Sequence, residues 1–175
     1  MVLKSTRKSN SIFDELKERL YIQRLIEIQF AYENYTEDEL DETLKNIDDD
    51  YDFNLFKLDE ISILARQTDE IKRKFIIQKL YIEKLNIPEK AKIENILTVA
   101  CLLNRHNNLI MDLNENTLYI LSLTLLNVGY QGISNFDYEP LIKKQLDIIL
   151  PIIGNMKDSL EKDKQYIIGK QNRSL

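Results

Sequence analysis

Apolar side chains recur at spacings of three and four along most of this 175-residue chain, while residues that turn a chain are scarce, with four glycines and three prolines. Such spacing places apolar side chains on one face of an α-helix. Valine, the commonest β-branched strand former, occurs only three times, and no internal repeat is evident. The sequence therefore predicts an all-α fold.

The first helix is expected from Ser11 to Asn34, and its second half is apolar on most sides, which predicts contact with more than one neighbour. Thr36 followed by Glu39 is typical of a capping box and opens a second helix. This helix is expected to run through Ile47 and to end at the acidic segment Asp48 to Asn54.

A third helix is expected from Ile61 to about Asn86, and a fourth begins after Pro88 and ends near Asn107. The fifth, from Leu118 to Val128, follows a potential cap at Asn114 or Asn116 and is hydrophobic all round. A helix without a polar face belongs inside a bundle. We therefore expect a single compact bundle of six or seven helices around this apolar central helix.

The C-terminal segment starts near Pro140 and keeps one helical phase through Pro151. The residues in this phase are Ile142, Leu146, Ile149, Ile153, Met156, Leu160 and Ile167. That continuity favours one kinked helix, although two helices meeting near Pro151 remain an alternative. Residues 11–168 are expected to form one domain, with a flexible basic tail at 1–10 and another flexible tail at 169–175.

Charge and composition restrict the setting of the protein. The net charge of about −5 argues against a general nucleic-acid binder, and no apolar run reaches the roughly 20 residues that span a bilayer. The opening residues lack the apolar core of a signal peptide, and Cys101 lies in an apolar run typical of a buried thiol. We expect a soluble cytoplasmic protein without a membrane partner. Abundant isoleucine, lysine and asparagine indicate an AT-rich genome, such as that of a virus, a phage or a mobile element.

One segment has the spacing of a calcium-binding loop. Asp48, Asp50, Asp52 and Asp59 stand at positions 1, 3, 5 and 12 of such a loop. However, Phe53 occupies the position where the loop needs glycine, and Asp59 replaces the usual glutamate. We interpret the segment as an exposed acidic loop, with calcium binding left open.

Residues for catalysis are scarce. His106 is the single histidine and follows Arg105 at a helix end, and no glycine-rich phosphate loop or cysteine pair is present in the sequence. Four carboxylates at the start of the second helix could bind magnesium, namely Glu37, Asp38, Asp41 and Glu42. The helix dipole favours acidic residues at this end of a helix, which accounts for them without a metal. The sequence predicts no catalytic residue, no cofactor and no metal ligand.

Aromatic residues gather at two connections. Tyr32, Tyr35 and Tyr51 lie near the acidic segment, and Tyr130, Phe136 and Tyr138 bracket the loop after the fifth helix. Large amphipathic rings often take part in partner recognition, and we expect this role more for Tyr130, Phe136 and Tyr138 than for the first group. The alternative is that these rings simply cover helix ends.

These observations predict a non-enzymatic helical protein that binds another protein, as a regulator, inhibitor or immunity-type factor. Its partner is expected to be basic, and a homodimer is possible. The candidate binding residues are Asp48, Asp49, Asp50, Asp52, Tyr130, Phe136 and Tyr138. Two alternatives remain: a nucleic-acid-associated regulator that uses its basic tails, and an enzyme with a carboxylate-bound metal.

Overall fold

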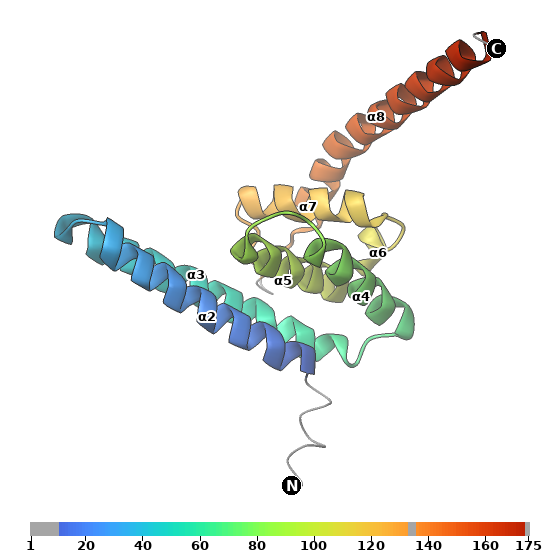
Figure 1. Cartoon of the computed structure of the whole chain (residues 1–175). Coiled ribbons are helices and arrows are strands. Elements are labelled where there is room, and N and C mark those ends of the chain that lie inside the picture. The colour runs from blue at the N-terminus through green and yellow to red at the C-terminus, as the bar shows by residue number, and fades with distance from the viewer. Residues whose placement is uncertain (1–10, 133–135, 174–175) are drawn as a thin grey trace, which may run out of the picture.

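The computed structural model describes residues 11–132 and 136–173, and within these ranges all regular structure is helical. The helices are α2 (Ser11–Asn34), α3 (Glu37–Leu64), α4 (Asp69–Glu83), α5 (Glu89–Arg105), α6 (Asn107–Ile110), α7 (Glu115–Asn127) and α8 (Glu139–Arg173), as Figure 1 shows. The predicted all-α fold and the predicted number of helices are confirmed for the described ranges.

Helix α5 lies at the centre of the bundle and contacts α2, α3, α4, α6 and α7. Every residue from Asn95 to Leu103 is buried, because neighbouring helices cover α5 on all sides. The segment expected at the centre, Leu118–Val128, is α7, and it packs between α5 and α8 with Leu123 and Val128 exposed. The apolar residues on all sides of α7 correctly predicted that this helix packs in the core, but the most deeply buried helix is α5.

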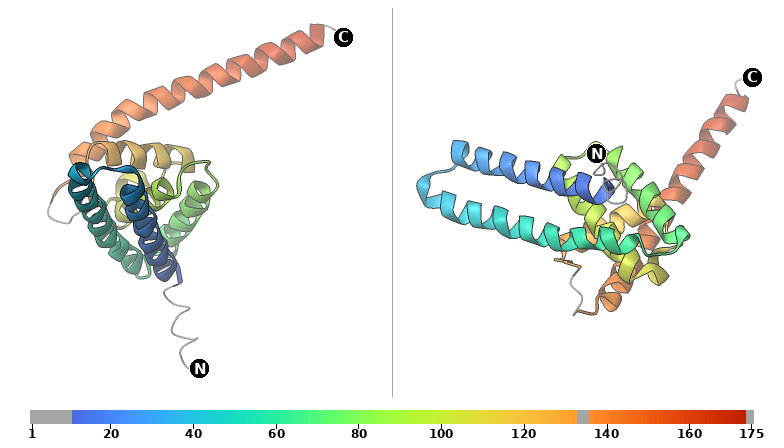
Figure 2. Two further views of the ribbon diagram at one scale, coloured as in Figure 1. Left: turned by 60° about the vertical axis from the view of Figure 1, so that its left-hand side comes forward. Right: turned by 90° about the horizontal axis from the view of Figure 1, so that it is seen from below.

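Helices α2 and α3 form a long antiparallel hairpin whose far end projects beyond the rest of the molecule (Figures 1 and 2). The expected helix end at Asp48–Asn54 is wrong, because α3 continues through this segment to Leu64. The inner face of α3 remains in phase across it, and Ile47, Leu58 and Ile61 are all buried. Burial of that face outweighs the weak helix propensity of consecutive aspartates.

The third helix does not start at Ile61, since the chain turns between α3 and α4 at residues 65–68. Thr68 caps α4, and its hydroxyl accepts a hydrogen bond of 3.4 Å from the backbone N–H of Ile71. The side chain of Asn114 caps α7 as expected and accepts from the N–H of Thr117 at 2.9 Å. The positive φ of 92° at Gly129 accompanies the turn that follows α7.

Helix α8 runs through Pro151 as one helix of 35 residues. Its first turns pack on α7 through Ile142, Leu146 and Ile149, which are buried, and its remainder extends away from the bundle (Figure 2). Residues 169–173, which were expected in a tail, continue α8. The predicted N-terminal tail, residues 1–10, lies outside the described residues.

Candidate protein interface

The acidic segment that was expected to be a loop is one stretch of helix on the projecting hairpin. A calcium loop wraps its ligands around the ion, whereas helical residues Asp48, Asp50, Asp52 and Asp59 point outward in different directions. Over the parts of the chain that are described, no group of three or more His, Cys, Asp or Glu side chains could hold a metal ion. The loop geometry on which the calcium alternative depended is therefore absent.

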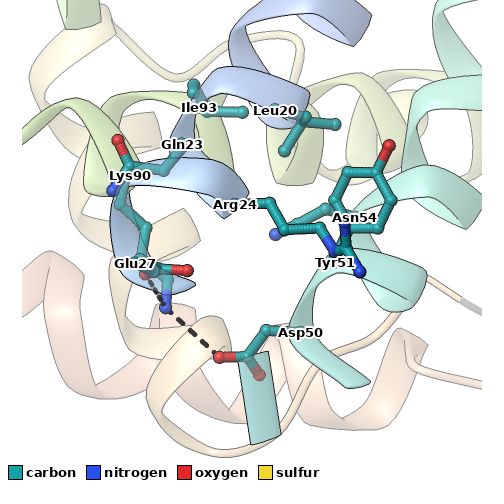
Figure 3. Close-up of a pocket in the computed structure, with 9 residues that line it drawn as sticks. All are labelled: Leu20, Gln23, Arg24, Glu27, Asp50, Tyr51, Asn54, Lys90 and Ile93. Atoms are coloured by element: carbon teal, nitrogen blue, oxygen red, sulfur yellow. Dashed lines mark hydrogen bonds and ion pairs between the residues drawn. The ribbon is translucent and has the colours of Figure 1, made fainter. Parts of the chain in front are cut away.

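Two of the candidate aspartates form salt bridges within the chain, although the Asp48 side chain stays 54% exposed and that of Asp50 56% exposed. Arg24 on α2 donates from Nη2 to Oδ1 of Asp48 at 2.9 Å, and its guanidinium lies 5.2 Å from the ring centre of Tyr51. Lys90 on α5 binds Asp50 at 3.2 Å and also contacts Glu27 on α2. Figure 3 shows Glu27, Asp50 and Lys90 coming together from α2, α3 and α5.

The same cluster surrounds a cavity of about 20 Å³, which is room for one water molecule. Burial acts to lower the pKa of Lys90, but the hydrogen bonds and charges of Glu27 and Asp50 outweigh burial and raise it. Lys90 therefore remains a cation, and Asp50 is engaged within the fold.

A second group of carboxylates on α3 is exposed, and none of its members has a salt bridge to any residue that the structure describes. Residues spaced by three, four and seven share one side of a helix. We define the acidic face of α3 as Asp38, Asp41, Glu42, Asp49, Asp52 and Asp59. Of the four predicted aspartates, Asp49 and Asp52 lie on this face, and Asp48 lies at its edge, four residues before Asp52. The exposed Lys45 lies on the same side and makes no salt bridge to a described residue.

A shallow groove of about 520 Å³ adjoins the end of the acidic face that is nearer the bundle. Its lining combines apolar residues of α2 and α3 with charged ones, namely Phe13, Lys17, Asp52, Leu55, Phe56, Leu58 and Asp59. Phe56 is 68% exposed although it is large and apolar. The sequence analysis missed Phe56 and this groove, because it treated the segment as a loop in which helical spacing has no meaning.

The aromatic group after α7 is mostly internal. Tyr130 is 1% exposed and Tyr138 is also buried, and their ring centres lie 4.5 Å apart. Burial raises the pKa of Tyr130 well above its ordinary value. Only Phe136, at 62% exposure, lies at the surface, whereas Tyr130 and Tyr138 are buried within the chain. A recognition role for this group stays a prediction.

The two reactive side chains of the sequence are not arranged for catalysis together. Cys101 is completely buried in α5, and burial raises the pKa of its thiol to about 12. His106 ends α5 and donates its backbone N–H to Leu102 O at 2.7 Å, while its half-buried ring makes no capping hydrogen bond. Burial lowers the pKa of His106, against the opposing charges of Asp137 and Glu139.

A polar cluster between α3 and α5 could not be foreseen from spacing. Glu60 is buried, and its Oε1 accepts from Nη2 of Arg105 at 2.5 Å. Lys57, one turn before it, is also buried and makes no hydrogen bond or ion pair with the described residues. These groups occupy the apolar side of α3, where a periodicity analysis expects leucine or isoleucine.

Comparisons with protein-family models, with curated proteins and with solved structures found no match to this chain. In addition, none of the helices within residues 11–132 and 136–173 has both the length and the hydropathy needed to cross a membrane. The acidic face and its groove therefore have to be interpreted from their own chemistry.

Proposed function

We propose that this protein is a non-enzymatic binding factor that engages a basic surface of another protein through the acidic face of α3. The observation that carries the proposal is a row of exposed carboxylates without cationic partners among the described residues, next to a groove that exposes Phe56. Unpaired carboxylates on one face attract a basic partner and orient it during encounter. An exposed aromatic ring beside them supplies apolar contact area.

The shape of the site indicates the kind of segment that fits. Asp52 and Asp59 border the groove, and Phe13 and Leu55 contribute apolar lining. The matching partner segment carries an apolar side chain that fills the groove, and lysines or arginines that reach the carboxylates. A regulator, inhibitor or immunity-type factor would act in this way, by covering a basic functional surface of its target.

The proposed setting is the cytoplasm, which accords with a single cysteine that is buried as a thiol. We further propose a viral, phage or mobile-element origin, and this rests on the AT-rich codon preference alone.

The experiment is an affinity capture from a host lysate with and without nuclease, followed by binding measurements on the partner that is recovered. Asp49→Lys together with Asp52→Lys should weaken binding by at least tenfold, and the affinity of the unaltered protein should fall as salt increases. The matched control is Asp112→Lys with Asp147→Lys, which makes the same change in net charge at exposed sites away from α3.

Equal loss of binding in the two double variants would contradict the proposal, because it would show an effect of net charge alone. Recovery of nuclease-sensitive material only would favour the nucleic-acid alternative.

A further inference from the structure

The groove beside the acidic face of α3 lies at the start of α2. Phe13 and Lys17 line it from α2, and Leu55 and Phe56 supply apolar surface from α3. Phe56 is 68% exposed, so the described residues leave most of a large apolar ring uncovered. The volume of about 520 Å³ is within the range of pockets that bind ligands. The lining therefore fits an occupant that has both apolar and charged side chains.

The charge of the groove favours a cationic occupant. Asp52 and Asp59 line it, are exposed, and have no salt bridge to a described residue. Lys17 also lines the groove, so two carboxylates stand against one lysine among the described lining residues. Asp49, one helical turn before Asp52 on the acidic face, adds to the attraction for a cation.

The sequence before α2 has the composition that this groove requires. Residues 1–10 read MVLKSTRKSN and directly precede Ser11, where α2 begins. They contain no acidic residue, and their apolar and cationic members are Val2, Leu3, Lys4, Arg7 and Lys8. The segment proposed for the partner has the same two characters, an apolar side chain for the groove and cations for its carboxylates.

The position and length of residues 1–10 allow them to reach the groove. Phe13 lies two residues after Ser11, so the segment joins α2 at one end of the groove. The groove follows α3 from Asp59 to Asp52, which is about 10 Å of helix at 1.5 Å per residue. Leu3 precedes Ser11 by eight residues, and an extended chain of that length spans up to about 26–29 Å. The segment can therefore turn back at the start of α2 and place Leu3 in the groove.

We propose that residues 1–10 occupy this groove within the same chain, with Leu3 against Phe56 and the cations near Asp52 and Asp59. The inference rests on the proposed function, because the segment takes the place of the partner's basic segment. A short tether gives an effective concentration on the order of 1 mM, so a contact with a Kd of about 0.1 mM fills the groove about nine-tenths of the time. An incoming partner has to displace the segment, which makes the acidic site self-inhibited.

The first test is disulfide formation within the full chain between Leu3→Cys and Lys17→Cys. The matched control pairs Leu3→Cys with Lys84→Cys, which makes the same charge change at another exposed lysine. Lys84 follows Glu83, which binds Arg19 of α2 at 2.8 Å. Arg19 lies about 200° around the helix from Lys17, so the control thiol is near α2 but on the side away from the groove.

The proposal expects the groove pair to oxidise at least tenfold faster than the control pair at low protein concentration, because docking raises the local concentration of the two thiols. The native Cys101 is buried and does not compete for oxidation. Equal rates for the two pairs would overturn the proposal. A product that is mainly a disulfide-linked dimer would also overturn it, in favour of the segment of a second copy as the occupant.

The second test measures whether the groove is already filled, with a fluorescent peptide of sequence MVLKSTRKSN as the probe. Val2→Ser with Leu3→Ser in the full chain removes the apolar contact without a change in charge. This variant should bind the peptide about tenfold more tightly than the native chain, as expected when the native groove is about nine-tenths filled. Phe56→Ser in the same variant should remove most of this binding, whereas Ile76→Ser, at an exposed apolar residue of α4, should leave it unchanged.

Equal affinity of the peptide for the native chain and the variant, or no binding to either, would overturn the proposal. The two hypotheses can fail separately. If residues 1–10 do not dock but Asp49→Lys with Asp52→Lys still weakens binding of the captured partner, the proposed function stands and self-inhibition falls. If residues 1–10 dock and the double-lysine variant keeps its partner, only the proposed function falls.

Discussion

Gly132 lies close to the side chain of Cys101, and this contact gives a quantitative prediction. A Cβ added to Gly132 would stand 2.7 Å from Sγ and 3.2 Å from Cβ of Cys101, and the residue has a φ of 72°. An L-residue with positive φ costs about 1–2 kcal/mol, partly offset by about 0.4–1 kcal/mol from the more restricted unfolded chain. Overpacking against a buried thiol adds about 1–3 kcal/mol. We expect Gly132→Ala to lower the free energy of unfolding by about 2–4 kcal/mol.

The assay is urea unfolding followed by circular dichroism, with Gly129→Ala as the matched variant. Gly129 has a φ of 92°, and a Cβ there would meet nothing within 4 Å, so this variant should show only the backbone cost of about 1 kcal/mol. Combining Gly132→Ala with Cys101→Ala removes the sulfur that the new methyl group would strike. The combined variant should therefore be more stable than the sum of the two single effects predicts. Equal destabilisation by Gly132→Ala and Gly129→Ala, with no coupling to Cys101, would refute the close approach.

Three other predictions concern the charged and buried groups. Arg19→Leu should lower the free energy of unfolding, measured in urea, by about 2–3 kcal/mol, because Arg19 makes two hydrogen bonds to Glu83 and its side chain is only 19% exposed. Lys72→Met, which removes an exposed ion pair, should change it by less than about 0.5 kcal/mol. Cys101 should react with iodoacetamide only as fast as the protein opens, and rapid alkylation of the folded chain would contradict its burial. Burial lowers the pKa of Lys57, so as pH rises the folded chain loses this proton before the unfolded chain does. The free energy of unfolding should therefore rise with pH until about 10.5, where Lys57 of the unfolded chain also loses its proton. Lys57→Met should abolish that part of the pH dependence.

Helical spacing predicted most element positions because local amphipathic patterns and caps act within a few residues. The bounds of α2, the start of α5 after Pro88 and the cap at Asn114 follow from such signals. The continuation of α3 through Asp48 to Asn54 does not, because it depends on burial of Ile47, Leu58 and Ile61 against helices that are distant in the sequence. The turn before Thr68 was missed because the apolar phase happens to match on both sides of it.

The sequence predicted the composition of the candidate binding site but not the contacts of its individual residues, for a similar reason. The acidic composition of the segment was evident, but the cations that each aspartate meets depend on the fold. Asp48 and Asp50 bind cations of α2 and α5, whereas Asp49 and Asp52 have no salt bridge to a described residue. An aromatic residue next to a glycine-containing loop can cover the core or face a partner. Tyr130 is buried and Phe136 is exposed, and this difference depends on tertiary contacts that the local spacing of residues does not predict.

The sequence expectation for α2 is met near the bundle, where α2 contacts both α3 and α5, but not along the projecting part of the hairpin. The second half of α2 is apolar on most sides, which predicts more than one neighbour, yet along the projecting hairpin α3 covers one side only. Ile22, Ile26 and Phe30 are left exposed on the side where the second neighbour was expected. A sequence is selected for the assembled protein, so an apolar face without a neighbour in one chain indicates a contact that forms in the assembly.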